Sequence, residues 1–275
     1  MAIDFDFWKK DYRLDKMTLK ELWVAYFMYP AIQVYILCAV VCAVLSIKLA
    51  ASIVPLVISA VAVTLLYPLF WYMLHRFVLH GSYLYRSPLT AKVWKRIHFD
   101  HHRDPHDLKV LFGSLYTTLP TILILVSPVG YLIGGTPSAL AAFSAGCVIT
   151  CFYEFCHCIQ HLKYKPKSKF LKYMKKYHLQ HHFHDENHNY GITNFIPDKL
   201  FKTFQVDPRA VKKSETVFNL GYTKGQVRKF PWVARMTHDI DFDKAVDEGV
   251  KQRRYIKAST SQQDNENSLE KRTVE

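Results

Sequence analysis

Histidine is the residue type in this chain whose spacing indicates chemistry. Fourteen histidines occur in 275 residues, and ten of them form four short clusters. The clusters are His75-x4-His80, His98-x2-His101-His102, His157-x3-His161 and His178-x2-His181-His182. Imidazole binds transition metals, and side chains three or four positions apart share one face of an α-helix. The last three clusters therefore predict metal ligands that converge from helices.

The first cluster fits a regular helix less well. Positions five apart point about 140° away from each other at 3.6 residues per turn. His75 and His80 can therefore face one metal only if the helix geometry changes near His80. We expect that change at Gly81, because glycine suits the end of a helix.

The number of histidines indicates the metal. Structural zinc takes four ligands and catalytic zinc usually three plus water, so ten histidines are too many for two zinc ions. Two six-coordinate ions with five imidazoles each would keep one open position apiece. Iron suits imidazole and has the redox chemistry to use such positions for O₂. We expect two iron ions with O₂ as co-substrate, although a purified sample could carry zinc.

The elements that must position these histidines are read from hydropathy. Residues 31–48 and 52–74 are almost free of charge, as are residues 115–133 and 137–156. Each stretch approaches the roughly twenty residues that cross a bilayer as a helix. The joint GGTP, residues 134–137, fits a tight turn, because glycine adopts positive φ and proline suits the first helical position. We expect an all-α integral membrane protein with four transmembrane helices in two hairpins.

Lysine and arginine predict the orientation of these spans. They are frequent in residues 1–30 and between the hairpins, whereas the hairpin tips carry only Lys48. By the positive-inside rule, both termini and the central stretch face the cytosol. A helical cytosolic cap, residues 75–114 and 157–258, would then carry a histidine-rich dimetal site at the membrane surface. The formal net charge of +13 indicates contact with anionic lipid headgroups, with no nucleic-acid partner.

The two ends of the chain differ from the spans. In residues 1–30, Thr18 and Glu21 form a capping box before a stripe of apolar and aromatic residues, which favours an amphipathic helix in the membrane interface. Residues 259–275 are polar and lack aromatic side chains, so we expect a disordered tail after a membrane domain that covers residues 31–258. Six cysteines lie in or beside the spans without a C-x-x-C pair, and are expected to be buried thiols.

The four-part pattern H-x4-H, H-x2-H-H, H-x3-H, H-x2-H-H resembles the membrane fatty acid hydroxylase superfamily, most closely its fatty acid 2-hydroxylase branch. The similarity runs from about Tyr72 to Phe204 and includes LHRFVLHG, HFDHHRDPHD, YEFCHCIQH, YHLQHHFHDENHNYGITN and PDKLFKTF. The resemblance implies that all ten clustered histidines bind the metals and that four transmembrane helices lie under a cytosolic cap. It also implies a membrane di-iron monooxygenase that hydroxylates carbon 2 of a fatty acyl chain, as a free fatty acid or a sphingolipid acyl group.

Two features depart from the family pattern. The H-P-G-G sequence of a fused cytochrome b5 domain does not occur in the chain. Electrons are therefore expected from a separate partner, namely cytochrome b5, a ferredoxin or a reductase. Many relatives have Trp-Asp after the last cluster, whereas this chain has Pro197-Asp198. Asp198 either orients a ligand imidazole or caps the helix that follows.

For several other residues the sequence leaves two roles open. Glu154 is either a carboxylate ligand or an ion-pair partner of Arg76 or a nearby lysine. The histidines outside the clusters are expected to be exposed or hydrogen-bonded, with a site-lining role as the alternative: His106, His184, His188 and His238. Four aromatic residues are candidates for the wall of a lipid channel, with core packing as the alternative: Tyr116, Phe152, Tyr153 and Tyr190.

Two other functions remain open from sequence. The same centre could hydroxylate, oxidise or desaturate a sterol, carotenoid or alkyl lipid, because related enzymes share the histidine pattern. A membrane metal transporter or buffer would also need histidines. Transporters hold their ligands near the bilayer midplane, whereas these histidines stand at the ends of spans. The expected host is the endoplasmic reticulum or a bacterial cytoplasmic membrane.

Overall fold

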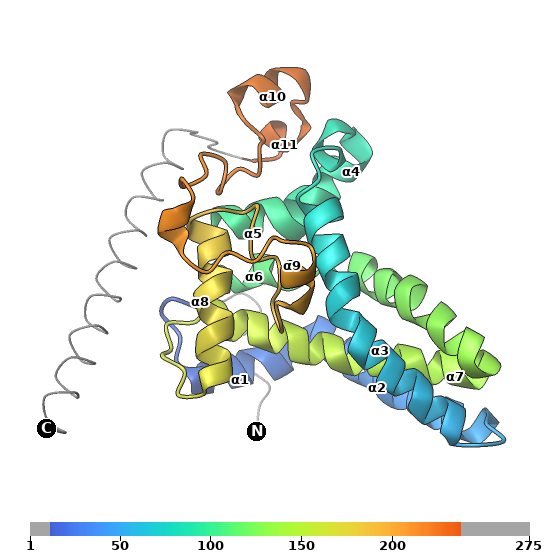
Figure 1. Ribbon diagram of the computed structural model, residues 1–275. Helices are drawn as coiled ribbons and strands as arrows, with labels where there is room; N and C mark the ends of the chain where they lie inside the picture. Colours follow the sequence, from blue (N-terminus) through green and yellow to red (C-terminus); the bar gives the residue numbers. More distant parts are fainter. Residues whose placement is uncertain (1–11, 238–275) are drawn as a thin grey trace, which may run out of the picture.

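The computed structural model describes residues 12–237, which form an all-helical protein (Figure 1). The predicted tail and residues 1–11 lie outside this range. Among the described residues, the only β-type pairing is an isolated antiparallel bridge between Arg13 and Asp107. The elements are α1 (Leu19–Met28), α2 (Pro30–Leu49), α3 (Val54–Met73), the π-helix η2 (Leu74–Leu79), the 3-10 helix η3 (Leu84–Arg86), α4 (Pro88–Trp94), the π-helix η4 (Lys95–Phe99), α5 (Asp100–Arg103), α6 (Leu108–Leu111), α7 (Leu115–His161), α8 (Lys169–Phe183), α9 (Ile196–Leu200), the 3-10 helix η5 (Pro208–Ala210), α10 (Lys224–Lys229) and α11 (Trp232–Arg235).

Three helical stretches in the described range are long and apolar enough to cross a membrane: Pro30–Leu49, Val54–Arg86 and Leu108–His161. Together they overlap the four expected spans. Large apolar side chains on them are exposed, for example Leu37, Leu65 and Leu132. Exposed apolar surface on helices of this length suits a lipid solvent, where a helix satisfies its own backbone hydrogen bonds. The described part of the chain is all-helical and has three stretches suited to a membrane.

The third stretch contains a reversal of the chain. Gly134 and Gly135 leave helical geometry inside α7, and Gly135 has a φ of 66°, as expected for the GGTP turn. A Cβ on Gly130 would lie 2.3 Å from the carbonyl oxygen of Ser138 and 2.6 Å from the Cβ of Ala142. Residues eight and twelve positions apart touch only if the helix folds back. Figure 1 shows the two legs of α7 meeting at this turn.

The amino-terminal helix begins where the sequence predicts. The side chain of Thr18 accepts the N–H of Glu21 at 3.3 Å, and Glu21 Oε2 accepts the N–H of Thr18 at 2.8 Å, so the capping box is confirmed. α1 buries Leu22 and Tyr26 in the helix bundle and exposes Trp23 and Phe27 on its other side.

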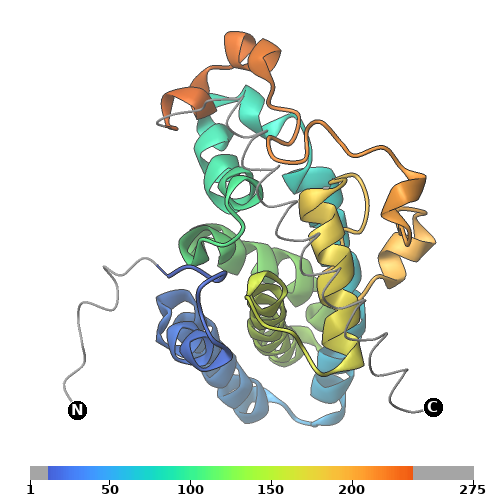
Figure 2. The same ribbon diagram turned by 90° about the vertical axis from the view of Figure 1, so that its left-hand side faces the viewer.

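Helices α1, α2, α3 and α7 share one apolar core. Ser144 of the second leg of α7 donates a hydrogen bond of 2.7 Å to the carbonyl of Ala39 in α2. α8 packs beside the end of α7 (Figure 2), and a separate aromatic cluster around Trp94 and Tyr222 joins α4 to α10 and α11. All six cysteines are free thiols, as expected, but three of them are only partly buried, namely Cys38, Cys42 and Cys151. This arrangement brings the ends of α3 and α7 close to α5 and α8.

Candidate metal centre

The π-helix η2 solves the problem of the first histidine cluster. The N–H of His80 donates to the carbonyl of His75 at 3.1 Å, which is the i to i+5 bond of a π-helix. With this wider turn, positions five apart lie on the same side, and the two Nε2 atoms are 3.2 Å apart. The expected change of geometry therefore occurs within residues 74–79 and not at Gly81. π-turns inside helices are frequent at functional sites.

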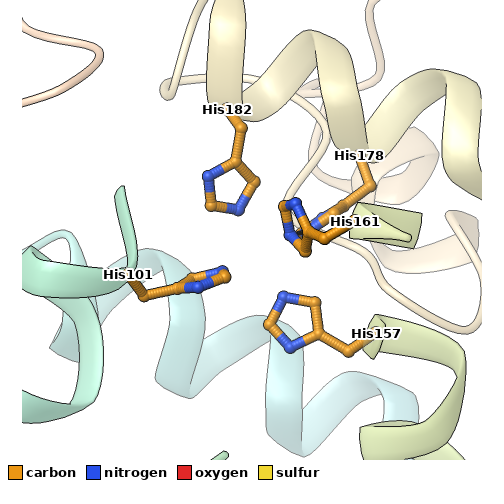
Figure 3. Close-up of side chains that lie close together, drawn as sticks. All are labelled: His101, His157, His161, His178 and His182. Carbon is orange, nitrogen blue, oxygen red and sulfur yellow. Dashed lines mark hydrogen bonds between the residues drawn. The ribbon is translucent and has the colours of Figure 1, made fainter. Parts of the chain in front are cut away.

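Five histidines from three elements form one cluster, which we call site A (Figure 3). Each offers a ring nitrogen, and these nitrogens all lie within 4.8 Å of one another. All five side chains are buried. α5 contributes one residue and α7 and α8 contribute two each: His101, His157, His161, His178 and His182.

A second cluster, site B, lies beside the first. Four histidines again place one nitrogen each within 4.8 Å of the others: His75, His80, His102 and His181. His98 is not within this limit, but its ring centroid lies 5.0 Å from that of His75 and 4.6 Å from those of His80 and His102. The structure thus gathers all ten clustered histidines, nine inside the two sites and His98 at the edge of site B.

The two His-His dipeptides divide between the sites. His101 belongs to site A and His102 to site B, while His182 belongs to site A and His181 to site B. Adjacent residues of a helix point about 100° apart at 3.6 residues per turn, so neighbours face different centres. The rings of His102 and His182 stack with centroids 4.2 Å apart. The dipeptides therefore hold sites A and B side by side.

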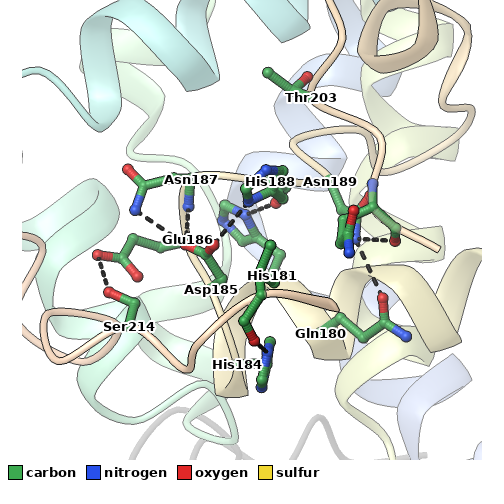
Figure 4. Close-up of polar contacts among 12 residues, drawn as sticks. Gln180, His181, His184, Asp185, Glu186, Asn187, His188, Asn189, Thr203 and Ser214 are labelled. Atoms are coloured by element: carbon green, nitrogen blue, oxygen red, sulfur yellow. Dashed lines mark hydrogen bonds and ion pairs between the residues drawn. The ribbon is translucent and has the colours of Figure 1, made fainter. Parts of the chain in front are cut away.

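Backbone carbonyls fix three rings of site B. A carbonyl oxygen only accepts, so the Nδ1 atom facing it must carry the proton, which leaves the Nε2 lone pair free for a metal. His188, whose carbonyl serves in this way, is held by a 2.7 Å contact of its own Nδ1 with Asp185 (Figure 4). The three bonds are His75 to Tyr190 at 2.6 Å, His102 to Val217 at 3.1 Å and His181 to His188 at 2.8 Å.

The donor set fits bound metal ions. Ten buried imidazole nitrogens find no hydrogen-bond partner among residues 12–237, and each such atom costs about 1–3 kcal/mol when left unsatisfied. Metal–imidazole bonds of about 2.0–2.1 Å place neighbouring ligand nitrogens about 2.9 Å apart and opposite ones about 4.1 Å apart. The Nε2 atoms of His161 and His178 are 2.9 Å apart. A cation in each site would satisfy nitrogens that the protein leaves without partners.

Burial also sets the protonation state of these rings. Desolvation, followed by the charges of neighbouring histidines, holds the pKa of His101, His178 and His182 well below the usual value. The imidazoles are therefore neutral at neutral pH, which is the form that binds a metal.

Asp198 has one of the two roles expected from sequence, and it has that role indirectly. It does not cap α9, whose N-cap is Phe195, and it contacts no imidazole directly. Its fully buried carboxylate accepts the backbone N–H groups of Tyr190 (2.8 Å) and Gly191 (2.9 Å). The carbonyl of Tyr190 in turn accepts from His75. Asp198 therefore orients the His75 ring through the peptide chain.

The other polar residues singled out in the sequence lie outside the two metal sites wherever the structure describes them. Three histidines outside the clusters are hydrogen-bonded as expected, since the Nδ1 of His106 donates to the carbonyl of His161, the Nε2 of His184 donates to that of Val211, and His188 contacts Asp185. His238 lies outside the described residues. Glu154 belongs to neither site and accepts the N–H of Gly113 at 3.2 Å, not a bond from Arg76.

Of the four aromatic candidates for a channel wall, two lie on the outer surface and two lie beside the metal sites. Tyr116 and Phe152 are more than half exposed on the outer surface, so neither lines a channel nor packs in the core. Tyr153 lines a cavity of about 140 Å³ that reaches both sites and is also bordered by Glu154. The ring of Tyr190 packs against three site B histidines, with centroids 5.1 to 5.5 Å from theirs.

Sequence reasoning missed the contacts that brace the ends of the site. The backbone of residues 12–14 pairs with His106 and Leu108, and the carbonyl of Leu14 accepts the N–H of Lys163. Arg13 forms an ion pair with Asp104. Because these partners lie far apart in sequence, only the folded arrangement reveals them.

Comparison with known proteins agrees with this geometry. The fatty acid hydroxylase family model matches residues 60–203. The chain is 33% identical over 152 residues to dihydroceramide fatty acyl 2-hydroxylase FAH2 of Arabidopsis thaliana, covering 52% of this chain and 59% of that protein. It is 28% identical to fatty acid 2-hydroxylase of Homo sapiens, covering 51% and 37%. The chain thus spans no more than about 60% of the length of these two relatives.

A solved structure shows that the similarity extends to the fold. The hydroxylase domain visible in full-length scs7p superimposes with a TM-score of 0.55 at 25% identity, covering 67% of this chain and 68% of that one. The family match covers just over half of the chain and contains all four histidine clusters. The chain belongs to the fatty acid hydroxylase family.

Proposed function

We propose that the chain is an O₂-dependent di-iron hydroxylase that places a hydroxyl group on carbon 2 of a fatty acyl chain, either a free fatty acid or a sphingolipid acyl group. The observation that carries the proposal is the pair of adjacent histidine sites, with five imidazoles at site A and four plus His98 at site B. Relatives named as acyl 2-hydroxylases support the substrate class.

The ligand count favours iron over zinc, because five imidazoles exceed what zinc takes in proteins. We propose all ten histidines as ligands, with one open position at each ion. Bound iron would supply the oxidising power to hydroxylate an unactivated C–H bond with O₂. One oxygen atom enters the product and the other leaves as water, which takes two electrons and two protons per turnover. A separate cytochrome b5, ferredoxin or reductase would deliver the electrons.

The residues of the chain would hold the metal ions, orient the ligand imidazoles and shield the reacting carbon from water. Burial keeps the imidazoles neutral, and the carbonyls behind His75, His102 and His181 keep their Nε2 atoms turned toward site B. The cavity beside both sites has apolar walls formed by side chains such as Leu74 and Ile97. An alkyl segment would replace water there, which protects the reacting carbon and favours binding.

We further propose that the three apolar stretches form four spans in two hairpins, with both termini and the metal centre on the cytosolic side. The reversal of α7 at Gly135 supports the second hairpin. His75 and His80 follow the last turn of α3, and His157 and His161 end α7. This placement at span ends suits chemistry at the membrane surface of the endoplasmic reticulum or a bacterial cytoplasmic membrane, and disfavours a transporter.

Metal content and lipid products from one preparation test the proposal. The protein is reconstituted with a reductase and electron carrier in liposomes that contain dihydroceramide, under O₂. We expect about two irons per chain and 2-hydroxyacyl product, as ten ligands for two six-coordinate ions imply. His101→Ala and His182→Ala should lose iron and product together. His184→Ala is the control, because His184 lies beside site A in sequence but binds the Val211 carbonyl.

Three outcomes would contradict the proposal. Unchanged iron and product in His101→Ala would exclude the ligand assignment. A sterol or carotenoid product without any 2-hydroxyacyl lipid would assign the centre to another substrate. Iron flux across the liposome membrane that survives His98→Ala, without hydroxylated lipid, would favour a transporter.

A further inference from the structure

Two neighbouring cavities share part of their lining on α3, η2 and the first leg of α7. The larger, of about 140 Å³, borders the histidines of both sites. The smaller, of about 10 Å³, lies among apolar side chains. The two share three lining residues: Trp71, Leu74 and Thr121. The smaller cavity therefore continues the space beside the metal centre.

The spacing of the lining residues makes this continuation a groove along two helices. On α3 and η2 the lining passes through Tyr67, Trp71, Leu74 and Val78, which are three or four positions apart. Such spacing keeps the side chains on one helix face. The eight residues from Tyr67 to Leu74 cover about 10 Å of helix. The groove thus leads from the metal centre into the membrane-spanning part of the bundle.

The opposite wall has the same spacing. On α7 the lining passes through Thr118, Thr121 and Leu125. Ile122 and Val126, which complete this wall, are backed by Gly146 of the second leg, where an added Cβ would lie 2.8 Å and 3.1 Å from their methyl groups. This close packing gives the wall a fixed shape.

The hydroxyl of Tyr67, on the groove wall, already has a partner within the protein. The hydroxyl of Tyr67 forms a 2.6 Å hydrogen bond with Thr150. The ring of Trp71, which lines both cavities, stacks on Tyr153 with centroids 4.9 Å apart. The groove therefore offers apolar surface to a ligand and few groups that a polar ligand could use.

We propose that this groove holds the acyl chain of the substrate and that Leu125 helps to set which chain lengths the enzyme accepts. The inference rests on the proposed function, because the occupant is the chain whose carbon 2 lies at the metal centre. A chain that leaves the larger cavity between Trp71 and Thr121 passes Leu125 before it enters the bilayer. Short chains end before Leu125, whereas long chains must pass it.

The test fills the far end of the groove. Leu125→Trp is compared with Ile124→Trp, which adds the same ring one position away on a side chain that is 69% exposed to lipid. Both variants are assayed with octanoyl, palmitoyl and lignoceroyl dihydroceramides. Overpacking a formed site should lower turnover of the two longer substrates by about tenfold or more in Leu125→Trp, with octanoyl turnover nearly unchanged. Ile124→Trp should keep the wild-type profile.

A second measurement uses the unmodified protein, so misfolding of Leu125→Trp cannot hide the answer. A palmitoyl lipid with a diazirine near the middle of its chain, in the part that would lie beside Leu125, is bound and photolysed, and the labelled residues are located by mass spectrometry. We expect labels on the groove residues Tyr67, Phe70 and Leu125. Labels confined to lipid-facing residues, or equal loss of all chain lengths in Leu125→Trp with wild-type iron content, would overturn the inference. Absence of any hydroxylated product from the wild type would instead overturn the proposed function, while labelling would still report on the groove.

Discussion

A single carboxylate links the loop after α8 to site B. Asp198 is fully buried and accepts the N–H groups of Tyr190 and Gly191 and the hydroxyl of Thr203, all at 2.8 to 2.9 Å. Burial raises its pKa to about 6, so the group is still ionised at pH 7. Its cost of desolvation is offset by these three donors. The same carboxylate thereby fixes the Tyr190 carbonyl on which His75 depends.

Asp198→Ala tests this link. The two N–H groups would lose their acceptor, which costs about 1–3 kcal/mol of unfolding free energy. Loss of an outer hydrogen-bond partner should also weaken metal binding about 10–100-fold, and the loss should fall on site B. Iron titration and thermal unfolding measure the two effects. Asp207→Ala is the control, because Asp207 bonds Arg209 within its own exposed turn. Wild-type iron affinity in Asp198→Ala would show that the Tyr190 peptide holds its place without the carboxylate.

At the scale of elements, helical spacing predicted much of the site, and tertiary contacts explain the rest. The i, i+3 and i+4 spacing correctly indicated helices at the end of α7 and in α8. The π-turn in η2 was not readable from sequence, because it depends on a remote partner. The carbonyl of Leu79, its last residue, accepts the indole N–H of Trp94 at 2.7 Å. The reversal of α7 was readable, because GGTP interrupts an apolar run with residues suited to a turn.

The contact between α8 and the end of α7 depends on Lys175. Its ammonium group donates to the carbonyls of Leu162 and Tyr164, and burial lowers its pKa to about 8. These carbonyls follow His161, which faces His178 across site A. Lys175→Met should destabilise the protein by about 1–3 kcal/mol and lower the iron content of site A, because two carbonyls lose a charged donor. Lys172→Met, on an exposed position of the same helix, should leave both unchanged. Equal melting temperatures and iron contents in the two variants would remove Lys175 from this role.

The hairpin of α7 gives a second prediction at this scale. Gly130 lies so close to Ser138 and Ala142 that any side chain must push the two legs apart. Gly130→Val should therefore lower the unfolding free energy by about 1–3 kcal/mol, as overpacking does elsewhere. Leu132→Val should cost less, because Leu132 lies on the same leg with a side chain that is 86% exposed, so the valine there points away from the other leg. Thermal unfolding in detergent compares them, and the reverse order of stability would contradict the close approach of the legs.

At the scale of the whole molecule, the ten histidines join segments that are distant in the chain. Site A takes residues from α5, α7 and α8, and site B takes residues from η2, α5 and α8. Each site therefore combines histidines from the ends of the long apolar helices with histidines from the shorter helices that follow them. In sequence, the clusters are separated by up to 55 residues, so ordering them closes long loops whose entropic cost the folded state must offset. Metal ions in both sites would act as cross-links between bundle and cap.

Chelation tests whether the proposed metal ions also stabilise the fold. Without cations, the buried imidazole nitrogens have no partners in the described part of the chain, so the iron-free protein should unfold at a lower temperature. A ligand at about 1,000 times its Kd stabilises a folded protein by about 4 kcal/mol, so removing it should shift the melting temperature by several degrees. The measurement compares holoprotein, chelated protein and protein reloaded with Fe²⁺ in the same detergent, and reloading should restore the original value. The double variant His101→Ala, His102→Ala removes a ligand from each site and should melt near the chelated protein, with little response to added Fe²⁺. An iron-free protein that melts at the holoprotein temperature would mean that the apolar core and the carbonyl contacts of the rings hold bundle and cap together without metal.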